Sequence, residues 1–513
     1  MVQINRELRI PAALGARESA VTRLLQRGKS LARAGRIAGA VDDFEAALAS
    51  ANPKRDARLC ADALDWLAWL AWIDLDGERT SAYARRMLTL ELPTTSLAAF
   101  RRCIRQATQT LQLGDALGAL ALLEEAEQAG RDADLDAFTA YLCVKADVYA
   151  ALGETDTALG HAQLAVDLAE KRSDRYQRWR RLEYFGYIKY KNGALQDALS
   201  TYLRAEQVAR GAGLTWEVPF TRVRAAWIAM LLGRLPQAHL LIASCFEFDE
   251  TVRWMVVTRA WVGLTIGLAV GDDRLVERCS DVSYLATALA SGDSYTLGRT
   301  AAAFHEYYID RGDGEAATRL LALAVDKLRS PDCAWPLFEA IATYGDAKLC
   351  ERATTLLAAF PDGYRMARAH RLLFAAVTAA REGDNDAAER LASQAQLAFE
   401  ESEHHYHAAR CIELAGRRSE AHQRYTQLGA VRDAHRTAVT RSRRGRPRGS
   451  YEVGRQRREI LALVLAGATT KTIAERLGIS IRTVKSRVAE IFELQDVSNR
   501  AELRALTRKC GTR

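Results

Sequence analysis

The feature that most constrains the fold of this chain is a glycine that returns on average about every 38 residues through most of its 513 residues. Each of these glycines lies between two apolar runs with helical spacing, where a glycine closes a turn in the left-handed conformation. Such a period predicts a repeat array. The recurring glycines are Gly35, Gly77, Gly114, Gly153, Gly193, Gly233, Gly271, Gly312, Gly345, Gly383 and Gly416.

Small and large residues keep a fixed register around these glycines. One unit has Gly28 and Phe44 at offsets 0 and 16, with an alanine at offset 12, and another has Gly186 and Tyr202 in the same places. Small residues at offsets 0 and 12 let the two helices of a hairpin cross closely, and the large residue fills the gap to the next unit. Because prolines number only 9 in the whole chain, we expect an all-α fold throughout.

This register resembles that of the tetratricopeptide repeat, with helices longer than the usual repeat of about 34 residues allows, as in the repeat regions of MalT-like regulators. The resemblance implies a helical solenoid of about eleven units over residues 1–435, with a concave groove that receives a ligand. Aromatic residues at helical spacing are candidates for that groove, although we expect most of them to fill the core between repeats. They are Trp66, Trp69, Trp72, Trp179, Tyr184, Tyr187, Tyr190, Trp254 and Trp261.

Residues 455–504 follow a different pattern, that of three short helices joined by small-residue turns. Gly467 ends the first helix, either Thr469 or Thr470 caps the second, and Ser480 caps the third. The third helix turns an apolar face that includes Val484 inward. Its other face carries cations and donors suited to phosphates and guanine edges. These are Arg482, Thr483, Lys485, Ser486 and Arg487.

The distribution of charge also favours nucleic-acid binding. Residues 441–513 hold 18 Lys and Arg against seven Asp and Glu, whereas the whole chain holds 72 against 64. All of the positive excess therefore lies in the last seventh of the chain. A basic module attached to a slightly acidic body is the electrostatic pattern of a DNA-binding protein.

Residues 453–506 resemble the LuxR-type (GerE) helix-turn-helix. GATTKTIAERLGIS, TVKSRVAEIF and VSNRAEL correspond to the family's Gly-x-Ser-Asn-Lys-x-Ile-Ala, Ile-Ser-x-x-Thr-Val-Lys and Val-x-x-Arg pattern. The resemblance implies a DNA-facing recognition helix and a last helix, near 499–508, that supports dimerisation. The residues expected to bind DNA are Thr469, Thr470, Lys471, Ser480, Arg482, Thr483, Val484, Lys485, Arg487 and Arg500.

Three positions depart from the family pattern. Arg487 stands where His is frequent, and Thr470 stands where Asn is usual. Leu494-Gln495-Asp496 replaces Lys-Leu-Gly, which affects the surface used for dimerisation. This last departure leaves open an alternative function, a protein-interaction scaffold whose helix-turn-helix is degenerate or docks on RNA polymerase.

A basic linker, residues 436–450, joins the predicted solenoid to the predicted DNA-binding domain at 451–513. It holds five arginines together with Gly445, Pro447 and Gly449, which interrupt regular structure. The arginines either reach flanking phosphates or remain solvated. They are Arg441, Arg443, Arg444, Arg446 and Arg448.

The sequence shows no arrangement typical of an enzyme, so we expect neither catalytic residues nor cofactors. Gly28-Lys29-Ser30 lacks the upstream glycine of a phosphate-binding loop, because Arg23 occupies that position. The 9 cysteines form no Cys-x2-Cys pair, and His404, His405 and His407 with Cys411 fit a helix start better than a metal site. Without a membrane span or a secretory signal, a cytoplasmic protein is expected.

Together these patterns predict a bacterial transcription regulator. Its repeats would sense a protein, peptide or small molecule, and its last domain would bind double-stranded DNA in a sequence-specific way. RNA polymerase is an expected partner, and a homodimer on DNA is a further possibility that the sequence leaves open. Such a device requires the signal to bind the active and inactive arrangements with different affinity.

Overall fold

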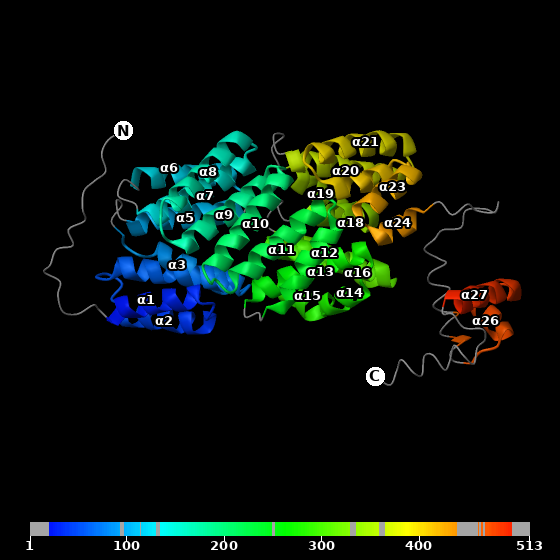
Figure 1. The fold of residues 1–513 in the computed structure, drawn as a ribbon, viewed down its shortest axis with the longest axis horizontal. Helices are drawn as coiled ribbons and strands as arrows, with labels where there is room; N and C mark the ends of the chain where they lie inside the picture. The colour runs from blue at the N-terminus through cyan, green and yellow to red at the C-terminus, as the bar shows by residue number, and fades with distance from the viewer. Residues whose placement is uncertain are drawn as a thin grey trace. The chain divides into compact units, whose positions relative to one another are not determined.

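The computed structural model describes residues 20–92, 97–112, 114–129, 134–248, 252–328, 335–358, 365–438, 460, 463, 464 and 467–494. All regular elements in these ranges are helices, which confirms the predicted all-α fold. The chain divides into two compact units, Met1–Val439 and Thr440–Arg513 (Figure 1).

The first unit is a succession of helical hairpins (Figure 1). Most helices pack most closely on a neighbour in the chain, whereas α13 packs most closely on α16 and α18 on α20. The second helix of one unit is split into α14 and α15. The helices are α1 (Ala20–Arg33), α2 (Ile37–Ser50), α3 (Ala57–Ile73), α4 (Gly77–Leu88), α5 (Leu97–Gln112), α6 (Ala116–Ala129), α7 (Leu135–Ala151), α8 (Thr155–Glu170), α9 (Arg175–Lys191), α10 (Leu195–Gly211), α11 (Glu217–Leu231), α12 (Leu235–Ser244), α13 (Arg253–Val270), α14 (Asp273–Cys279), α15 (Val282–Ala290), α16 (Ser294–Arg311), α17 (Gly314–Lys327), α18 (Trp335–Tyr344), α19 (Ala347–Ala358), α20 (Arg365–Glu382), α21 (Asn385–Glu401), α22 (His405–Leu414), α23 (Arg418–Leu428) and α24 (Val431–Thr437). A short 3-10 helix, η2 (Cys245–Glu247), follows α12.

The turn glycines adopt the left-handed conformation at nine of the eleven predicted positions, with φ between 71° at Gly35 and 90° at Gly114. The prediction is wrong at Gly77 and Gly345, neither of which has a positive φ. Before Gly77, Leu75 takes the left-handed conformation instead, with φ of 55°. An L-residue in this conformation costs about 1–2 kcal/mol. Because Gly77 itself has no positive φ, the backbone conformation does not explain the glycine at position 77.

The predicted register of small and large residues is present in the hairpins. A Cβ on Gly28 would lie 2.9 Å from Cε1 of Phe44, and a Cβ on Gly186 would lie 2.9 Å from Cε1 of Tyr202. The two rings are 0% and 1% exposed. Phe44 also stacks on Trp66 of the next unit, with ring centroids 5.8 Å apart. The large residue therefore fills two spaces, one over its own glycine and one toward the next repeat.

Turns of the solenoid also contact residues much further along the chain. Trp216 packs on Gly35, and the ring of Trp72 lies 6.0 Å from that of Trp254. We call the contacts between turn glycines and residues about 180 to 210 positions later the turn seam. Its pairs are Gly35 with Trp216, Gly77 with Ser291, Gly193 with Ser402, and Gly233 with Leu428.

The turn seam explains the glycine at position 77. A Cβ on Gly77 would overlap the backbone carbonyl oxygen of Ser291 and lie 3.3 Å from Cα of Gly292. Backbone atoms cannot swing away as a side chain does, so a residue larger than glycine would push the two segments apart. Glycine is kept at this position by a close approach and not by its φ.

The second unit contains the described helices α26 (Thr470–Leu477) and α27 (Ile481–Leu494). Apolar side chains from both helices and from the segment before them form a separate small core. Its buried members are Ile460, Val464, Ile473, Ala474, Val484 and Val488.

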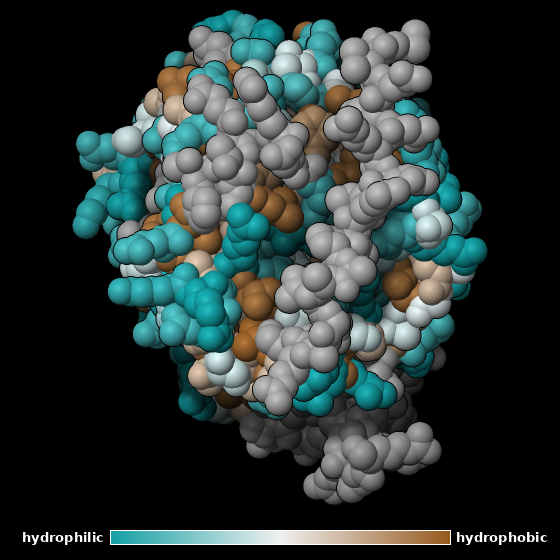
Figure 2. All heavy atoms as spheres, turned by 90° about the vertical axis from the view of Figure 1, so that its left-hand side faces the viewer, coloured by the Kyte–Doolittle hydropathy of each residue, from teal (hydrophilic) through white to brown (hydrophobic). Residues whose placement is uncertain are grey.

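Among the described residues, exposed large apolar side chains occur on many different helices of the solenoid. Leu117 on α6 and Leu240 on α12 are examples, with 70% and 72% of their surface exposed. Figure 2 views the end of the solenoid at which α1 and α2 lie, and there hydrophilic side chains predominate, with hydrophobic ones between them. Within the described ranges no helix is both long and apolar enough to span a membrane.

Replacing Gly77 by alanine tests the turn seam. We expect Gly77→Ala to lower the free energy of unfolding by about 2 kcal/mol, because overpacking against backbone costs about 1–3 kcal/mol. The matched control is Gly160→Ala in α8, where an added Cβ meets nothing within 4 Å. That change should raise stability by about 0.5–1 kcal/mol, because alanine favours helix over glycine. Urea unfolding followed by circular dichroism measures both, and equal effects of the two substitutions would contradict the seam.

Candidate nucleic-acid interface and solenoid cavity

Side-chain caps fix both described helices of the second unit. The Thr469 hydroxyl accepts a hydrogen bond from the backbone N–H of Thr472 at 3.2 Å, and the Ser480 hydroxyl accepts one from the backbone N–H of Thr483 at 3.0 Å. Gly478 ends α26 with φ of 63°. The cap of α26 is thus Thr469, one of the two threonines that the sequence offered. Each cap satisfies a backbone donor that a helix start leaves open.

The structure corrects the place of Val484. Its side chain is 0% exposed and belongs to the apolar core with Ile473 and Val488. A fully buried side chain cannot touch a base, so we remove Val484 from the expected DNA contacts. Its position in the family motif is explained by packing.

The remaining predicted residues differ in exposure. Thr469, Lys471, Ser480, Arg482 and Lys485 are exposed, whereas Thr470, Thr483 and Arg487 are partly buried. Arg500, the linker arginines and Gln495-Asp496 lie outside the described residues.

One ridge of α27 presents its side chains to solvent. The exposed positions have helical spacing of one, three and four residues and so share one face. This exposed ridge consists of Ile481, Arg482, Lys485, Ser486 and Ala489. Sequence reasoning missed Ile481 and Ala489 as surface residues, because it searched for cations and donors. A count along the helix from the buried Val484 and Val488 would have found them.

The solenoid contains a small, partly open cavity. Its walls come from α11, α13 and α16 on the one hand, and from α18, α20 and α22 on the other. Its lining includes Trp227, Trp261, Arg299, Glu306, Glu339 and Arg410.

Two arginines have different surroundings in this cavity. Arg410 forms ion pairs with Glu306 and Glu339, each at 2.9 Å. Arg299 lies with its guanidinium carbon 5.4 Å from the ring centre of Trp227 and 5.5 Å from that of Trp261. Such guanidinium–ring contacts stabilise a desolvated cation. Arg299 also donates a hydrogen bond of 2.8 Å to the hydroxyl of Tyr190.

The imidazoles near the cavity are neutral at physiological pH. Burial, with additional repulsion from His404 and from the Arg299 cation, lowers the pKa of His370 to about 3. Burial also lowers the pKa of His407 well below its usual value, helped by His370, His404 and Arg410. Charge in the cavity therefore rests on the arginines and glutamates.

Most aromatic candidates from the sequence lie in the core, as expected. Trp179, Trp254 and Trp261 are 3%, 1% and 2% exposed, and Tyr190 is 9% exposed. Trp66, Trp69, Trp72, Tyr184 and Tyr187 are partly buried against the same core. Trp261 is the candidate that also lines the cavity. Trp227 and Arg299 were missed, because the cavity joins helices from distant parts of the chain and leaves no local signal.

Two sequence features that resemble other sites have structural roles. The Nδ1 atom of His404 is 2.7 Å from the backbone oxygen of Ser402, and among the described residues no cluster of three or more metal-ligating side chains occurs. Gly28, Lys29 and Ser30 lie inside α1. A helix interior does not form the loop that cradles a phosphate.

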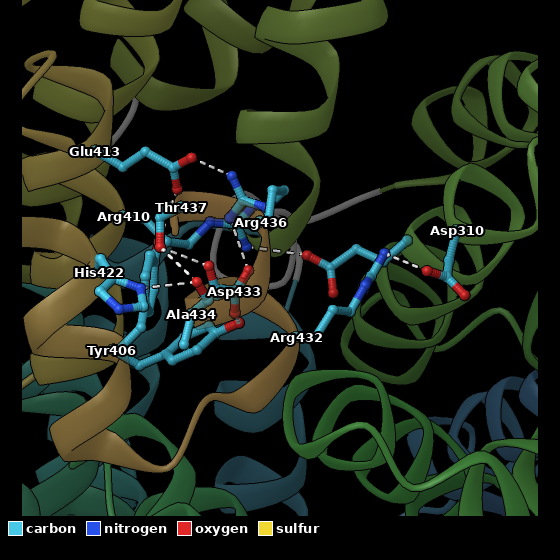
Figure 3. Close-up of polar contacts among 12 residues, drawn as sticks. Asp310, Tyr406, Arg410, Glu413, His422, Arg432, Asp433, Ala434, Arg436 and Thr437 are labelled. Atoms are coloured by element: carbon cyan, nitrogen blue, oxygen red, sulfur yellow. Dashed lines mark hydrogen bonds and ion pairs between the residues drawn. The ribbon is translucent and has the colours of Figure 1, made fainter. Parts of the chain in front are cut away.

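The last helix of the solenoid, α24, is tied to distant helices by polar contacts (Figure 3). The Tyr406 hydroxyl of α22 donates to Asp433 at 2.8 Å, and Arg432 forms an ion pair with Asp310 of α16 at 2.8 Å. Arg436 binds both Asp433 and Glu413. This arrangement places α24 beside a cavity-lining helix and directly before the residues that lead to the second unit.

A substitution at Val484 separates packing from DNA contact. Val484→Thr keeps the shape of the side chain but buries a hydroxyl, which should cost about 1–3 kcal/mol. We expect faster amide hydrogen exchange in α27 of the full-length protein, measured by mass spectrometry. Ser486→Ala, on the exposed ridge, should leave the exchange unchanged. Unchanged exchange in Val484→Thr would mean that position 484 is not part of the core.

Comparison with known proteins agrees with this geometry. Residues 454–506 match the model of the family described as bacterial regulatory proteins of the luxR family. A search of curated proteins finds no match.

Several solved structures are similar to the chain. A Rap protein complexed with Competence and Sporulation Factor is 13% identical, with 80% of this chain and 99% of that chain covered and a TM-score of 0.43. The Rap conjugation regulator of plasmid pLS20 in complex with the Phr* peptide is 14% identical, with 66% and 94% covered and a TM-score of 0.39. Yeast Tom70 is 14% identical, with 79% and 96% covered and a TM-score of 0.27. TM-scores this low carry no functional inference.

The family match and the helix geometry lead to one description. The chain carries a tetratricopeptide-like helical solenoid followed, at residues 454–506, by a LuxR-type helix-turn-helix domain.

Proposed function

We propose that this chain is a bacterial transcription regulator that binds double-stranded DNA through α27. The observation that carries the proposal is the exposed ridge, which places Arg482 and Lys485 on one face of a helix held by a cap and a small core. An α-helix of this kind fits the major groove of DNA.

Each part of the module has a role in this proposal. Arg482 and Lys485 have the chemistry to bind phosphates or the O6 and N7 atoms of guanine. The N-termini of α26 and α27, capped by Thr469 and Ser480, carry partial positive charge that favours a nearby phosphate. Ile481 and Ala489 supply apolar surface that suits a thymine methyl group.

The solenoid supplies the regulation in this proposal. Residues 1–435 sense a protein, peptide or small-molecule signal, and residues 451–513 bind DNA. Residues 436–450 connect these two parts. Contacts of α24 with α16 and α22 support this coupling between the solenoid and the DNA-binding residues. A shift of either helix would also shift α24, which precedes the linker. The regulator would act in the cytoplasm, contact RNA polymerase and bind DNA as a homodimer.

A regulatory role without catalysis is part of the same proposal. The matched family is one of regulatory proteins and not of enzymes. The charged groups of the solenoid cavity that we describe are engaged in ion pairs and ring contacts, as in a binding site.

Replacing Lys485 tests the proposed interface. We expect Lys485→Ala to weaken binding to all duplexes about tenfold and to reduce the slope of log K against log salt by about 1, because one phosphate contact is lost. Fluorescence anisotropy with the full-length protein at several salt concentrations measures both quantities.

The matched control removes the same charge from the solenoid. Arg274→Ala changes an exposed arginine of α14 and should leave the affinity and the slope unchanged. If both variants lose affinity equally, binding is a general effect of net charge, and the exposed ridge of α27 is not the interface. If neither the wild type nor a variant binds any duplex at low salt, the interaction scaffold is the better function.

A further inference from the structure

Three histidines gather around one phenylalanine where α20, α21 and α22 meet. The ring centroids of His370 and His407 lie 5.6 Å apart, and those of His404 and His407 lie 5.9 Å apart. All three imidazoles also contact the ring of Phe399, with centroid distances of 5.0, 6.1 and 5.1 Å. Phe399 and His404 are 0% exposed, and His370 is 6% exposed. We call His370, His404 and His407 the histidine cluster.

Two rings of the cluster have a nitrogen atom to which the fold offers no partner. The Nε2 atom of His404 and the Nδ1 atom of His407 are buried and make no hydrogen bond among the described residues. The other nitrogen atom of His404, Nδ1, lies 2.7 Å from the backbone oxygen of Ser402. A proton added to either unpartnered atom would create a buried charge without an acceptor, which is costly. The cluster therefore suits neutral imidazoles.

The cations around the cluster also oppose a proton. Burial, the neighbouring imidazoles and the cation of Arg299 in α16 lower the pKa of His370 to about 3 and that of His404 to about 4. Burial, the other two imidazoles and Arg410 of α22 lower the pKa of His407 well below its usual value. Each imidazole thus makes protonation of the next one harder.

Carboxylates from the neighbouring elements face other groups. Glu306 of α16 and Glu339 of α18 each pair with Arg410 at 2.9 Å. His405 lies outside the cluster and faces charges from α21, from the turn before α22, from the residue before α12 and from α23. These charged groups are Glu400, Glu403, Arg234 and Arg424. The carboxylates named here are thus engaged with other partners and do not compensate a proton on the cluster.

The cluster adjoins a turn whose backbone is held in place by its contacts. Glu403 takes the left-handed conformation with φ of 59°, which an L-residue keeps only where its surroundings hold it. Its carboxylate accepts a hydrogen bond of 2.7 Å from the backbone N–H of Gln196. Ser402 packs on Gly193 in the turn seam. The start of α22 is therefore strained, and His404 lies at this start.

The same helix holds α24. Tyr406 lies between His404 and His407 in the sequence, and its hydroxyl donates to Asp433 of α24 at 2.8 Å. On α23, the Nδ1 atom of His422 lies 2.8 Å from the backbone oxygen of Ala434. Because α24 has only 7 residues, its position depends on such contacts. A movement of α22 would therefore also disturb α24.

We propose that the histidine cluster is an acid-sensitive lock, which holds α22 and α24 in place while its imidazoles are neutral and releases both helices when they take up protons. A charged imidazole is more stable in water than in this buried site, so proton uptake and opening are coupled. The lock goes beyond the proposed function, because it makes acidity a further signal to the solenoid. Only the transfer of that signal to DNA rests on the proposed function.

The direction of the pH effect follows from this coupling. The pKa of His370 and of His404 is lower in the closed arrangement than the 6.5 of a solvated imidazole. The cluster therefore stabilises the closed arrangement fully above pH 6.5 and loses this effect as the pH falls toward the lowered pKa values. For each of these two imidazoles, a change from pH 7 to pH 5 should raise the equilibrium constant for opening about twentyfold.

Hydrogen exchange of the full-length protein, measured by mass spectrometry at pH 7 and pH 5, tests the lock. Division of each observed rate by the intrinsic rate at the same pH gives the opening constant. We expect α22 and α24 to lose protection together at pH 5. In contrast, α2 contains no histidine and should keep its protection, which distinguishes local opening from unfolding of the whole solenoid.

Three variants locate the effect. His404→Asn keeps an N–H group for the Ser402 oxygen and removes the titration, so the change in opening constant between the two pH values should fall about twentyfold. His435→Asn is the matched control, because His435 is exposed on α24, and it should alter this change less than twofold. Tyr406→Phe should open α24 already at pH 7, while α22 keeps its pH dependence.

The proposal is overturned by any of three results. These are a less than tenfold change in the opening of wild-type α22, an unaltered pH dependence in His404→Asn, or an opening of α22 that leaves α24 protected. If His404→Asn does not fold, the wild type and Tyr406→Phe still decide. Because the exchange samples contain no DNA, these results do not depend on DNA binding. Anisotropy with a duplex reports the proposed function separately.

Discussion

The close approach between turn glycines and residues about 200 positions later is the contact on which the cavity and the position of α24 depend. Units of a simple solenoid contact only their neighbours. Here, a Cβ on Gly77 would overlap the backbone of Ser291, and one on Gly233 would have to displace the side chain of Leu428. The last helices also pack on α11 and α13, and the cavity is lined by helices between α11 and α22.

This arrangement has consequences for stability and for regulation. A change at a single turn affects two distant units, so the array should be more cooperative than a chain of independent neighbours. Polar contacts such as the ion pair of Arg432 with Asp310 fix the position of α24 more narrowly than apolar contacts do, because they form only when α24 lies against α16. In the proposed function, a ligand influences the distant module by binding more tightly when such contacts are formed, or when they are broken.

Much of the fold could be predicted from the sequence, because local rules decide it. The glycine period and the register of Gly28 with Phe44 follow from the steric demands of a helical hairpin. Likewise, Thr469 and Ser480 were recognisable as caps, since a cap acts on residues only three positions away. The prediction for position 77 was wrong, because the glycine there is required by a contact with a residue 214 positions later, which no local sequence pattern indicates.

The candidate sites divide in the same way. Helical spacing alone places Val484 in the core, whereas the family motif had suggested a DNA contact, and the buried position decides between them. The cavity was beyond prediction, since Trp227 and Arg410 lie far apart in the chain and meet only in the folded solenoid.

The most direct test of the account is selection of duplexes from a random DNA library by the full-length protein at about 150 mM salt, where nonspecific binding is weak. The account predicts that the selected duplexes share a short motif, and that Arg482→Ala alters this motif at a defined position. Retained duplexes without a common motif, or no retention at any salt concentration, would contradict the claim that α27 reads DNA.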